Sequence, residues 1–316
     1  MKQPALITSF LVTLLTGTAS FTEVHAADAV VEPNPILIPY EAPKRSVLIG
    51  GGAGFQPLYE GSDEYRAFPF PIISYDSGET GPRRFEFRAL DDIRFHALRF
   101  SGISVGPIAG YRFGREESDS TRLTGLGDID GGIVLGGFAS YEFFQDDHMT
   151  WSADVGISTQ VTGDPFDERR FDNIALPANV RAQLGDGYEY GYEIDFGFSG
   201  EIAVDERLNI GMRVGATYAS EEYLQTNFGV SAAQAFAANS LGNPINTFDA
   251  DAGIKNIYLN VNATYELTDK IQLRAGLGYS RLIGDAAKSP ITEDKNQFSG
   301  NLGIAYRFKF CLVDGT

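Results

Sequence analysis

The chain has 316 residues, of which 42 are Asp or Glu and 25 are Lys or Arg, so its formal net charge is -17. An acidic surface of this size repels phosphate backbones and argues against nucleic acid as a partner. The single cysteine, Cys311, allows no internal disulfide, so packing and backbone pairing must supply the stability. Beyond the N-terminus no apolar run reaches the ~18 residues of a spanning helix, which excludes a helical membrane protein.

The first 26 residues predict a secretory signal peptide. Lys2 precedes a short apolar run, and small residues surround the expected cleavage site after Ala26. An N-terminal membrane anchor is disfavoured, because the run is shorter than the ~20 residues of a spanning helix. Residues 27–45 are rich in proline and lack periodicity, which predicts an extended periplasmic segment.

From residue 46 to residue 310 the sequence alternates with period two. In the stretch RLNIGMRVGATY at 207–218, every second residue from Leu208 is apolar and the residues between are polar, charged or glycine. A soluble antiparallel sheet also alternates. Soluble strands average ~5 to 6 residues, however, whereas a tilted membrane strand needs ~9 to 11. The long alternations and the aromatic residues at their ends therefore favour a membrane barrel, whose closure leaves no strand edge exposed to lipid.

We predict an all-β fold, a transmembrane antiparallel up-and-down β-barrel over residues 46–310. The count is about twelve strands, within limits of ten and fourteen. Residues 174–186 are assigned to a loop or a strand extension, because a further span would reverse the sidedness of all later turns. The expected strands are 46–56, 65–76, 83–90, 92–98, 101–113, 129–144, 149–162, 188–204, 207–220, 254–268, 270–284 and 296–310.

The connections between the expected strands are of two kinds. Short polar turns are predicted to face the periplasm, and long segments are predicted to be extracellular loops, as is usual for outer-membrane barrels. The short turns are 145–148, 205–207 and 268–270, and the long loops are 114–128, 221–253 and 284–295.

The polar face of the strands predicts a charged barrel interior. Rings of charge could line a selective pore. A twelve-strand barrel has a modest bore, however, so ion pairs that plug it are the favoured interpretation. The candidate interior charges are Glu142, Asp154, Glu189, Glu193, Asp195, Glu201, Arg84, Arg88, Arg112, Arg213, Arg274 and Arg307.

No pattern in the sequence points to catalysis, a cofactor or a metal. His96 and His148 lie near expected periplasmic strand ends, as surface or interfacial side chains rather than members of a lipid-hydrolase triad. Asp128 and Asp130 could contribute oxygen ligands to calcium, but the further ligands of such a site are not evident. The glycine run 50–52 opens no helix and is expected to let neighbouring strands or interior side chains approach closely.

Several stretches resemble the MipA/OmpV family of outer-membrane proteins. They are GGGAGFQPLYEGSDEYRAFPFPIISY, GPIAGYRFGR, LTGLGDIDGGIVLGGFASYEF, EEYLQTNFGVSAAQA and GYSRLIGDAAKSPITEDKNQFSGNLGIAYRF. The resemblance implies an outer-membrane barrel of a Gram-negative bacterium and provides no catalytic residue. Residues 163–187 depart from the family by being longer and more polar, and the tail 311–316 extends past the usual terminal aromatic residue.

For the member that gives the family its name, the resemblance implies a scaffold. That protein brings a lytic murein transglycosylase together with a bifunctional murein synthase. We therefore expect a monomeric interaction protein in outer-membrane lipid that is not an enzyme. A small-solute or osmotic-response channel and a surface adhesin are the alternatives, and a lipid-modifying enzyme lacks a positioned nucleophile and base.

The last strand is expected to carry the assembly signal. Outer-membrane barrels commonly end on an aromatic residue that the barrel assembly machinery recognises, which here implies Tyr306, Phe308 and Phe310. The tail CLVDGT is predicted to be an unstructured periplasmic extension without a catalytic role for Cys311. Truncation after Phe310 should leave outer-membrane yield unchanged or improved in a fractionation experiment, and a drop in yield would show that the tail contributes.

Overall fold

A computed structural model describes residues 45–76, 85–166, 177–181 and 188–310. The predicted signal peptide, the lead-in up to residue 44 and the tail 311–316 lie outside the described residues. Thirteen strands occur in the described part: β1 Arg45–Pro57, β2 Tyr65–Asp76, β3 Phe85–Ala89, β4 Asp92–Phe95, β5 Leu98–Phe100, β6 Ile103–Arg112, β7 Gly132–Gln145, β8 Met149–Gln160, β9 Glu193–Ala203, β10 Leu208–Ala219, β11 Gly253–Glu266, β12 Ile271–Leu282 and β13 Asn296–Phe310.

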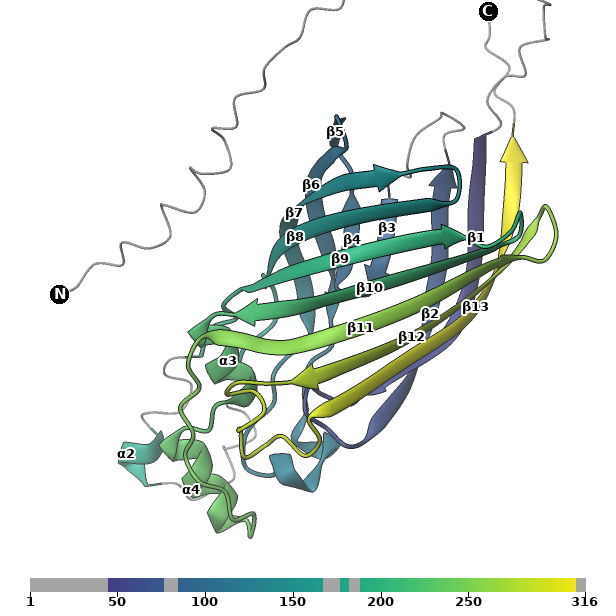
Figure 1. Ribbon diagram of the computed structural model, residues 1–316. Coiled ribbons are helices and arrows are strands. Elements are labelled where there is room, and N and C mark those ends of the chain that lie inside the picture. Colours follow the sequence, from purple (N-terminus) through teal and green to yellow (C-terminus); the bar gives the residue numbers. More distant parts are fainter. Residues whose placement is uncertain (1–44, 77–84, 167–176, 182–187, 311–316) are drawn as a thin grey trace, which may run out of the picture. The chain divides into compact units, whose positions relative to one another are not determined.

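The strands form one curled antiparallel sheet (Figure 1). Its order is β2-β1-β13-β12-β11-β10-β9-β8-β7-β6-β4-β3, with β5 also paired to β6. Except at β2–β3 and β4–β5, strands that follow one another along the chain pair with each other. The first strand pairs with the last, from Arg45 opposite Phe310 to Phe55 opposite Gly300. The twelve positions of this path confirm the predicted up-and-down β-barrel architecture. Among the described residues, no ladder joins β2 to β3.

Two predicted strands were wrong in their limits. The expected strand 92–98 is two short strands, β4 and β5, which both pair with β6. The expected strand from residue 188 starts only at Glu193, so Tyr188 and Tyr190 precede β9. Gly191 has a φ of 59°, a left-handed conformation that interrupts extended backbone and that glycine adopts without strain.

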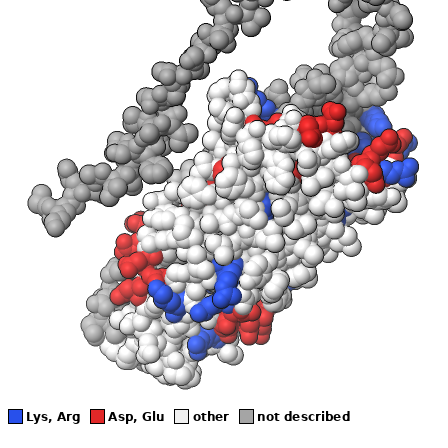
Figure 2. All heavy atoms as spheres, in the orientation of Figure 1, with Lys and Arg blue, Asp and Glu red and all other residues white. Residues whose placement is uncertain are grey.

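The outer face of the sheet is apolar and the inner face is polar. Outward side chains such as Ile73, Leu277 and Leu302 are each at least 67% exposed, whereas Arg94 on the inner face is only 1% exposed. Figure 2 shows a largely uncharged zone between charged groups at the two ends of the sheet. This inverted distribution is that of a membrane barrel, with lipid outside and charge within.

Long connections gather at one end of the sheet and short turns at the other (Figure 1). The long ones carry the helical segments η1 Glu117–Asp119, η2 Thr121–Leu123, α2 Ala178–Arg181, α3 Glu221–Phe228 and α4 Ala232–Ser240. No described helix has the length and apolar character needed to cross a membrane. By the usual asymmetry of outer-membrane barrels, the end with the long connections is extracellular.

The long connections pack into a cap with its own apolar core. In one cluster, α4 and the β6–β7 connection pack together; in the other, α3 packs against the β12–β13 connection. The buried residues of the two clusters are Tyr59, Leu123, Leu126, Val230, Ala235, Ala238, Ile245 and Ile291, and Ala219, Tyr223, Leu224, Phe228, Ala250, Leu282 and Ala286. Tyr59 also donates a hydrogen bond to Glu293 at 2.7 Å, and burial together with this carboxylate raises the pKa of its hydroxyl.

Candidate functional site in the barrel interior

Asp154 on β8 organises the centre of the interior. Its side chain has no exposed surface, and its Oδ1 accepts hydrogen bonds from Arg88 at 2.8 Å and Arg94 at 2.7 Å. Arg213 on β10 donates to both carboxylate oxygens. Three guanidinium groups from three strands thus converge on one buried carboxylate, an arrangement that is stable only while every charge remains paired.

Asp195 on β9 continues this network. Arg213 pairs with it as well, and the Tyr258 hydroxyl donates to its Oδ2 at 2.7 Å. The Nε of Arg213 in turn donates to the Tyr258 hydroxyl at 3.0 Å. Gly197 makes this possible, because a Cβ at that position would collide with the Arg213 guanidinium.

A second network joins the wall to the cap. Lys255 on β11 is 4% exposed, and its Nζ lies 2.5 Å from Glu193 on β9 and 2.5 Å from Glu60 in the β1–β2 connection. Tyr223 on α3 donates to Glu60 at 3.0 Å and accepts from Lys255 at 3.2 Å. Arg112 on β6 pairs with Glu193 and faces the Tyr223 ring at 5.3 Å. This network connects three strands to two cap segments.

A third network lies at the end with the short turns. Arg307 on β13 is 2.5 Å from Glu266 at the end of β11. Gln272 donates to the same carboxylate at 2.7 Å and accepts from Arg274 at 2.7 Å. Networks of charged and polar side chains therefore occur at the centre, at the cap end and at the short-turn end of the interior.

Eight of the twelve sequence-predicted interior residues join these networks. Arg84 lies outside the described residues. Glu142 on β7 and Glu201 on β9 lie toward the short-turn ends of their strands. Glu189 was wrongly placed in the interior, because it precedes β9 and is exposed. The eight residues brought together are Asp154, Glu193, Asp195, Arg88, Arg112, Arg213, Arg274 and Arg307.

Sequence reasoning missed Lys255, which the alternation places on the lipid face. Opposite Lys255, Thr217 pairs with Asn256 and Tyr218 pairs with Ile254, so the lysine is the extra residue of a β-bulge. A bulge shifts the side-chain parity and brings the lysine inward. Glu60, Arg94 and Tyr223 were also missed, because they lie on a connection, a short strand and a helix whose positions the alternation does not fix.

The other candidate residues have local roles. His96 lies inside rather than at the surface, with Nδ1 2.6 Å from the Ser104 hydroxyl and Nε2 3.3 Å from Glu86, which corrects its expected position. Asp128 accepts a hydrogen bond from the Glu117 amide at 2.8 Å and so shapes its loop. No group of three His, Cys, Asp or Glu side chains that could hold a metal occurs in the described part of the chain.

The glycine run 50–52 within β1 serves close packing, as expected. The rings of Phe70 and Phe68 lie where a Cβ on Gly52 or Gly54 would be, and Ala305 of the last strand lies equally close to Gly50. Small residues on β1 thus let two interior aromatic side chains and the neighbouring strand approach the wall.

An apolar outer face, a charge-paired interior and long connections at one end define an outer-membrane β-barrel. The chain belongs to the MipA family, since the family model described as MltA-interacting protein MipA matches residues 49–308.

Solved structures of outer-membrane proteins are also similar to this chain. The channel DcaP of Acinetobacter baumannii has 9% sequence identity and a TM-score of 0.36, with 84% of this chain and 96% of that chain covered. A Pseudomonas aeruginosa FadL homologue has 9% identity and a TM-score of 0.34, with 85% and 90% covered. No curated protein sequence matches the chain.

Proposed function

We propose that this barrel is a monomeric interaction protein of the outer membrane that brings a lytic murein transglycosylase together with a bifunctional murein synthase. The match to the MipA family over residues 49–308 carries the proposal, because the family description names an MltA-interacting protein. The proposal assigns the chain no catalysis, cofactor or metal.

The interior supports an interaction role better than transport. Ion pairs connect opposite parts of the wall through Asp154 and Arg213, and the cap packs against the wall through Lys255 and Glu60. A scaffold needs a firm platform and no open bore. The binding surface in this proposal consists of the short exposed turns, which face the periplasm.

Site-specific crosslinking in intact cells tests the scaffold. A photoreactive residue is placed at His148, Glu206 or Lys270, each exposed in a different short turn, and Lys288 in the cap is the control position. The turn positions are expected to capture a murein transglycosylase or synthase, identified by mass spectrometry, and the cap position is expected to capture neither. Capture of neither enzyme from any turn would contradict the proposal.

A small-solute channel is the second candidate, because mixed charges line the interior as they do in selective pores. Planar-bilayer recording of the purified protein separates the two functions. The paired interior predicts conductance at background level. Reproducible conductance steps that change when Arg213→Gln is introduced would instead support the channel.

A further inference from the structure

The wall of the barrel has a seam between β2 and β6 at its extracellular end. The β3–β4 hairpin, which lies between β2 and β6, is short. β3 has five residues and β4 has four, whereas a spanning strand needs ~9 to 11. The tip of the hairpin reaches no further than Leu90, whose carbonyl oxygen accepts a hydrogen bond from the Tyr111 amide at 2.8 Å. Beyond that point, no ladder in the described part of the chain joins β2 to β6.

Two prolines explain why β2 ends the sheet here. Pro69 and Pro71 lie two residues apart, so their nitrogens face the same edge of β2, while the ladder with β1 runs unbroken from Tyr65 to Asp76. Proline is tolerated in a sheet where its nitrogen faces away from the ladder. The free edge therefore lacks two donors that lipid could not satisfy, and a neighbouring strand could not pair fully with it.

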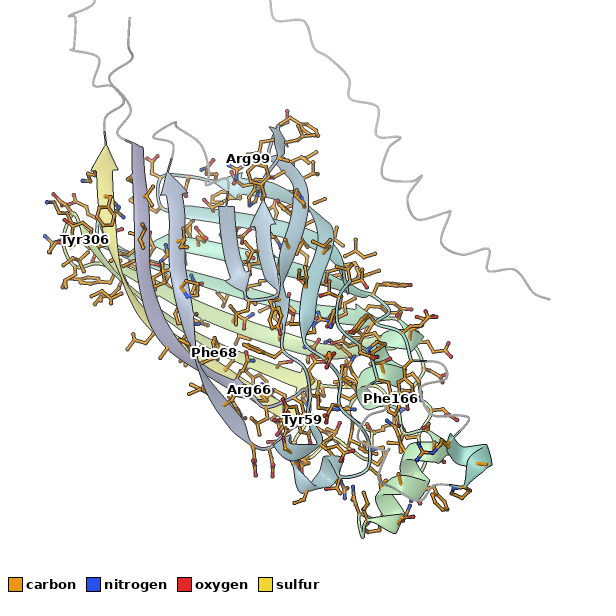
Figure 3. The ribbon with its side chains drawn as sticks, turned by 180° about the vertical axis from the view of Figure 1, so that it is seen from behind. Tyr59, Arg66, Phe68, Arg99, Phe166 and Tyr306 are labelled. Atoms are coloured by element: carbon orange, nitrogen blue, oxygen red, sulfur yellow. The ribbon has the colours of Figure 1, made fainter. Side chains whose placement is uncertain are left out.

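Aromatic side chains fill the seam instead of hydrogen bonds. The Phe68 ring of β2 lies 6.4 Å from the Phe113 ring beyond β6, and Phe113 is 5.8 Å from Tyr111. Tyr111 and Phe113 are 47% and 38% exposed on the lipid-facing side. The seam is thus continuous with the apolar belt. Figure 3 shows Phe68 and Arg66 in succession along β2 toward the cap.

A polar pocket of about 350 Å³ lies at the extracellular end of the seam, lined by Arg66, Tyr111, Phe113 and the β6–β7 connection. The Arg66 guanidinium lies 5.3 Å from the Phe113 ring centre, and its Nε and Nη2 are buried without a hydrogen-bond partner. Its ion pair with Asp119 is long, at 3.9 Å. Glu116, Asp128 and Asp130 also line the pocket. The pocket therefore offers donors to an anion beside carboxylates for a cation.

We propose that the seam binds one outer-leaflet lipid whose headgroup carries a phosphate next to a primary amine. Its acyl chain lies along Tyr111 and Phe113, in continuity with the lipid belt. Its phosphate accepts from Arg66, and its ammonium group faces Asp119 and Asp130. Neither a simple anion nor a simple cation fits this pocket. An anion would meet four carboxylates, and a cation would leave the arginine donors unused.

Native mass spectrometry of the folded full-length protein tests the headgroup. Dioleoyl phosphatidylethanolamine, phosphatidylcholine and phosphatidylglycerol are offered at equal concentration. Retention of phosphatidylethanolamine about tenfold above the other two is expected, since each loses one charge-assisted hydrogen-bonding partner. Equal retention of the three lipids, or preference for phosphatidylglycerol, would overturn the proposal. This arm needs no variant.

Variants test the location of the site. Arg66→Gln and Phe113→Ala should each lower phosphatidylethanolamine retention about tenfold. Phe298→Ala is the matched control, because Phe298 is 50% exposed on β13 at the same end of the sheet but outside the seam. Unchanged mobility shift on boiling verifies folding of each variant. Retention in Arg66→Gln equal to that in the wild type would place the lipid elsewhere and refute the site.

Discussion

Asp154→Asn should lower the free energy of unfolding by about 3 to 5 kcal/mol, the cost of removing one partner from a buried ion pair. The substitution preserves side-chain size but leaves Arg88, Arg94 and Arg213 facing one another without their shared carboxylate. Denaturant unfolding in lipid vesicles measures the effect. Trp151, the only tryptophan, lies on the same strand and reports it by fluorescence.

Two further variants test whether the loss of stability comes from the buried ion pairs or from the removal of any carboxylate. Asp147→Asn, at an exposed position in a short turn, should change stability by less than about 0.5 kcal/mol. Adding Arg213→Met to Asp154→Asn should recover part of the loss, because it removes one of the three cations that face one another there. If Asp154→Asn behaved like the turn variant, the central network would have no role in holding the wall together.

Lys255→Met should detach the cap from the wall. The methionine fills a similar volume but removes the buried cation that Glu60 and Glu193 share. We expect cleavage within the cap by subtilisin to accelerate at least about tenfold, since a loss of ~1.4 kcal/mol in local stability already gives that factor. Limited proteolysis followed by mass spectrometry of the fragments measures the rate and the position.

Lys288→Met is the matched control for this experiment. Lys288 is also a cap-end lysine paired with a carboxylate, Asp285, but its side chain is 69% exposed. Exposed ion pairs of this kind contribute little, so its cleavage rate should remain that of the wild type. Equal rates for both variants would show that the buried network does not hold the cap.

The strands could be predicted from the sequence because lipid and a polar interior impose opposite requirements on alternate residues. That rule locates β10, β12 and β13 to within a few residues. It fails where the backbone departs from period two, at Gly191 before β9 and at the bulged Lys255. The alternation also does not predict which interior side chains pair, because the contact of Arg94 with Asp154 depends on barrel curvature and side-chain length.

The cap was predicted only as loops, although its helices carry local signals. Ser231 and Gln234 form a capping box at the start of α4, and Ser220 caps α3. The spacing of a serine three residues before a glutamine is visible in the sequence. The period-two alternation does not extend to these helices, so it gives no sign of the separate apolar core beyond the barrel.

The pairing of β1 with β13 has a kinetic consequence. The ladder from Arg45 opposite Phe310 joins the two ends of the barrel sequence, so it is among the most non-local contacts the chain can make. The N-terminal strand is synthesised first but cannot find this partner until the last residues have left the ribosome. Throughout export the β1 edge must therefore be kept from pairing with other chains, and closure of the ladder is expected to come late in folding.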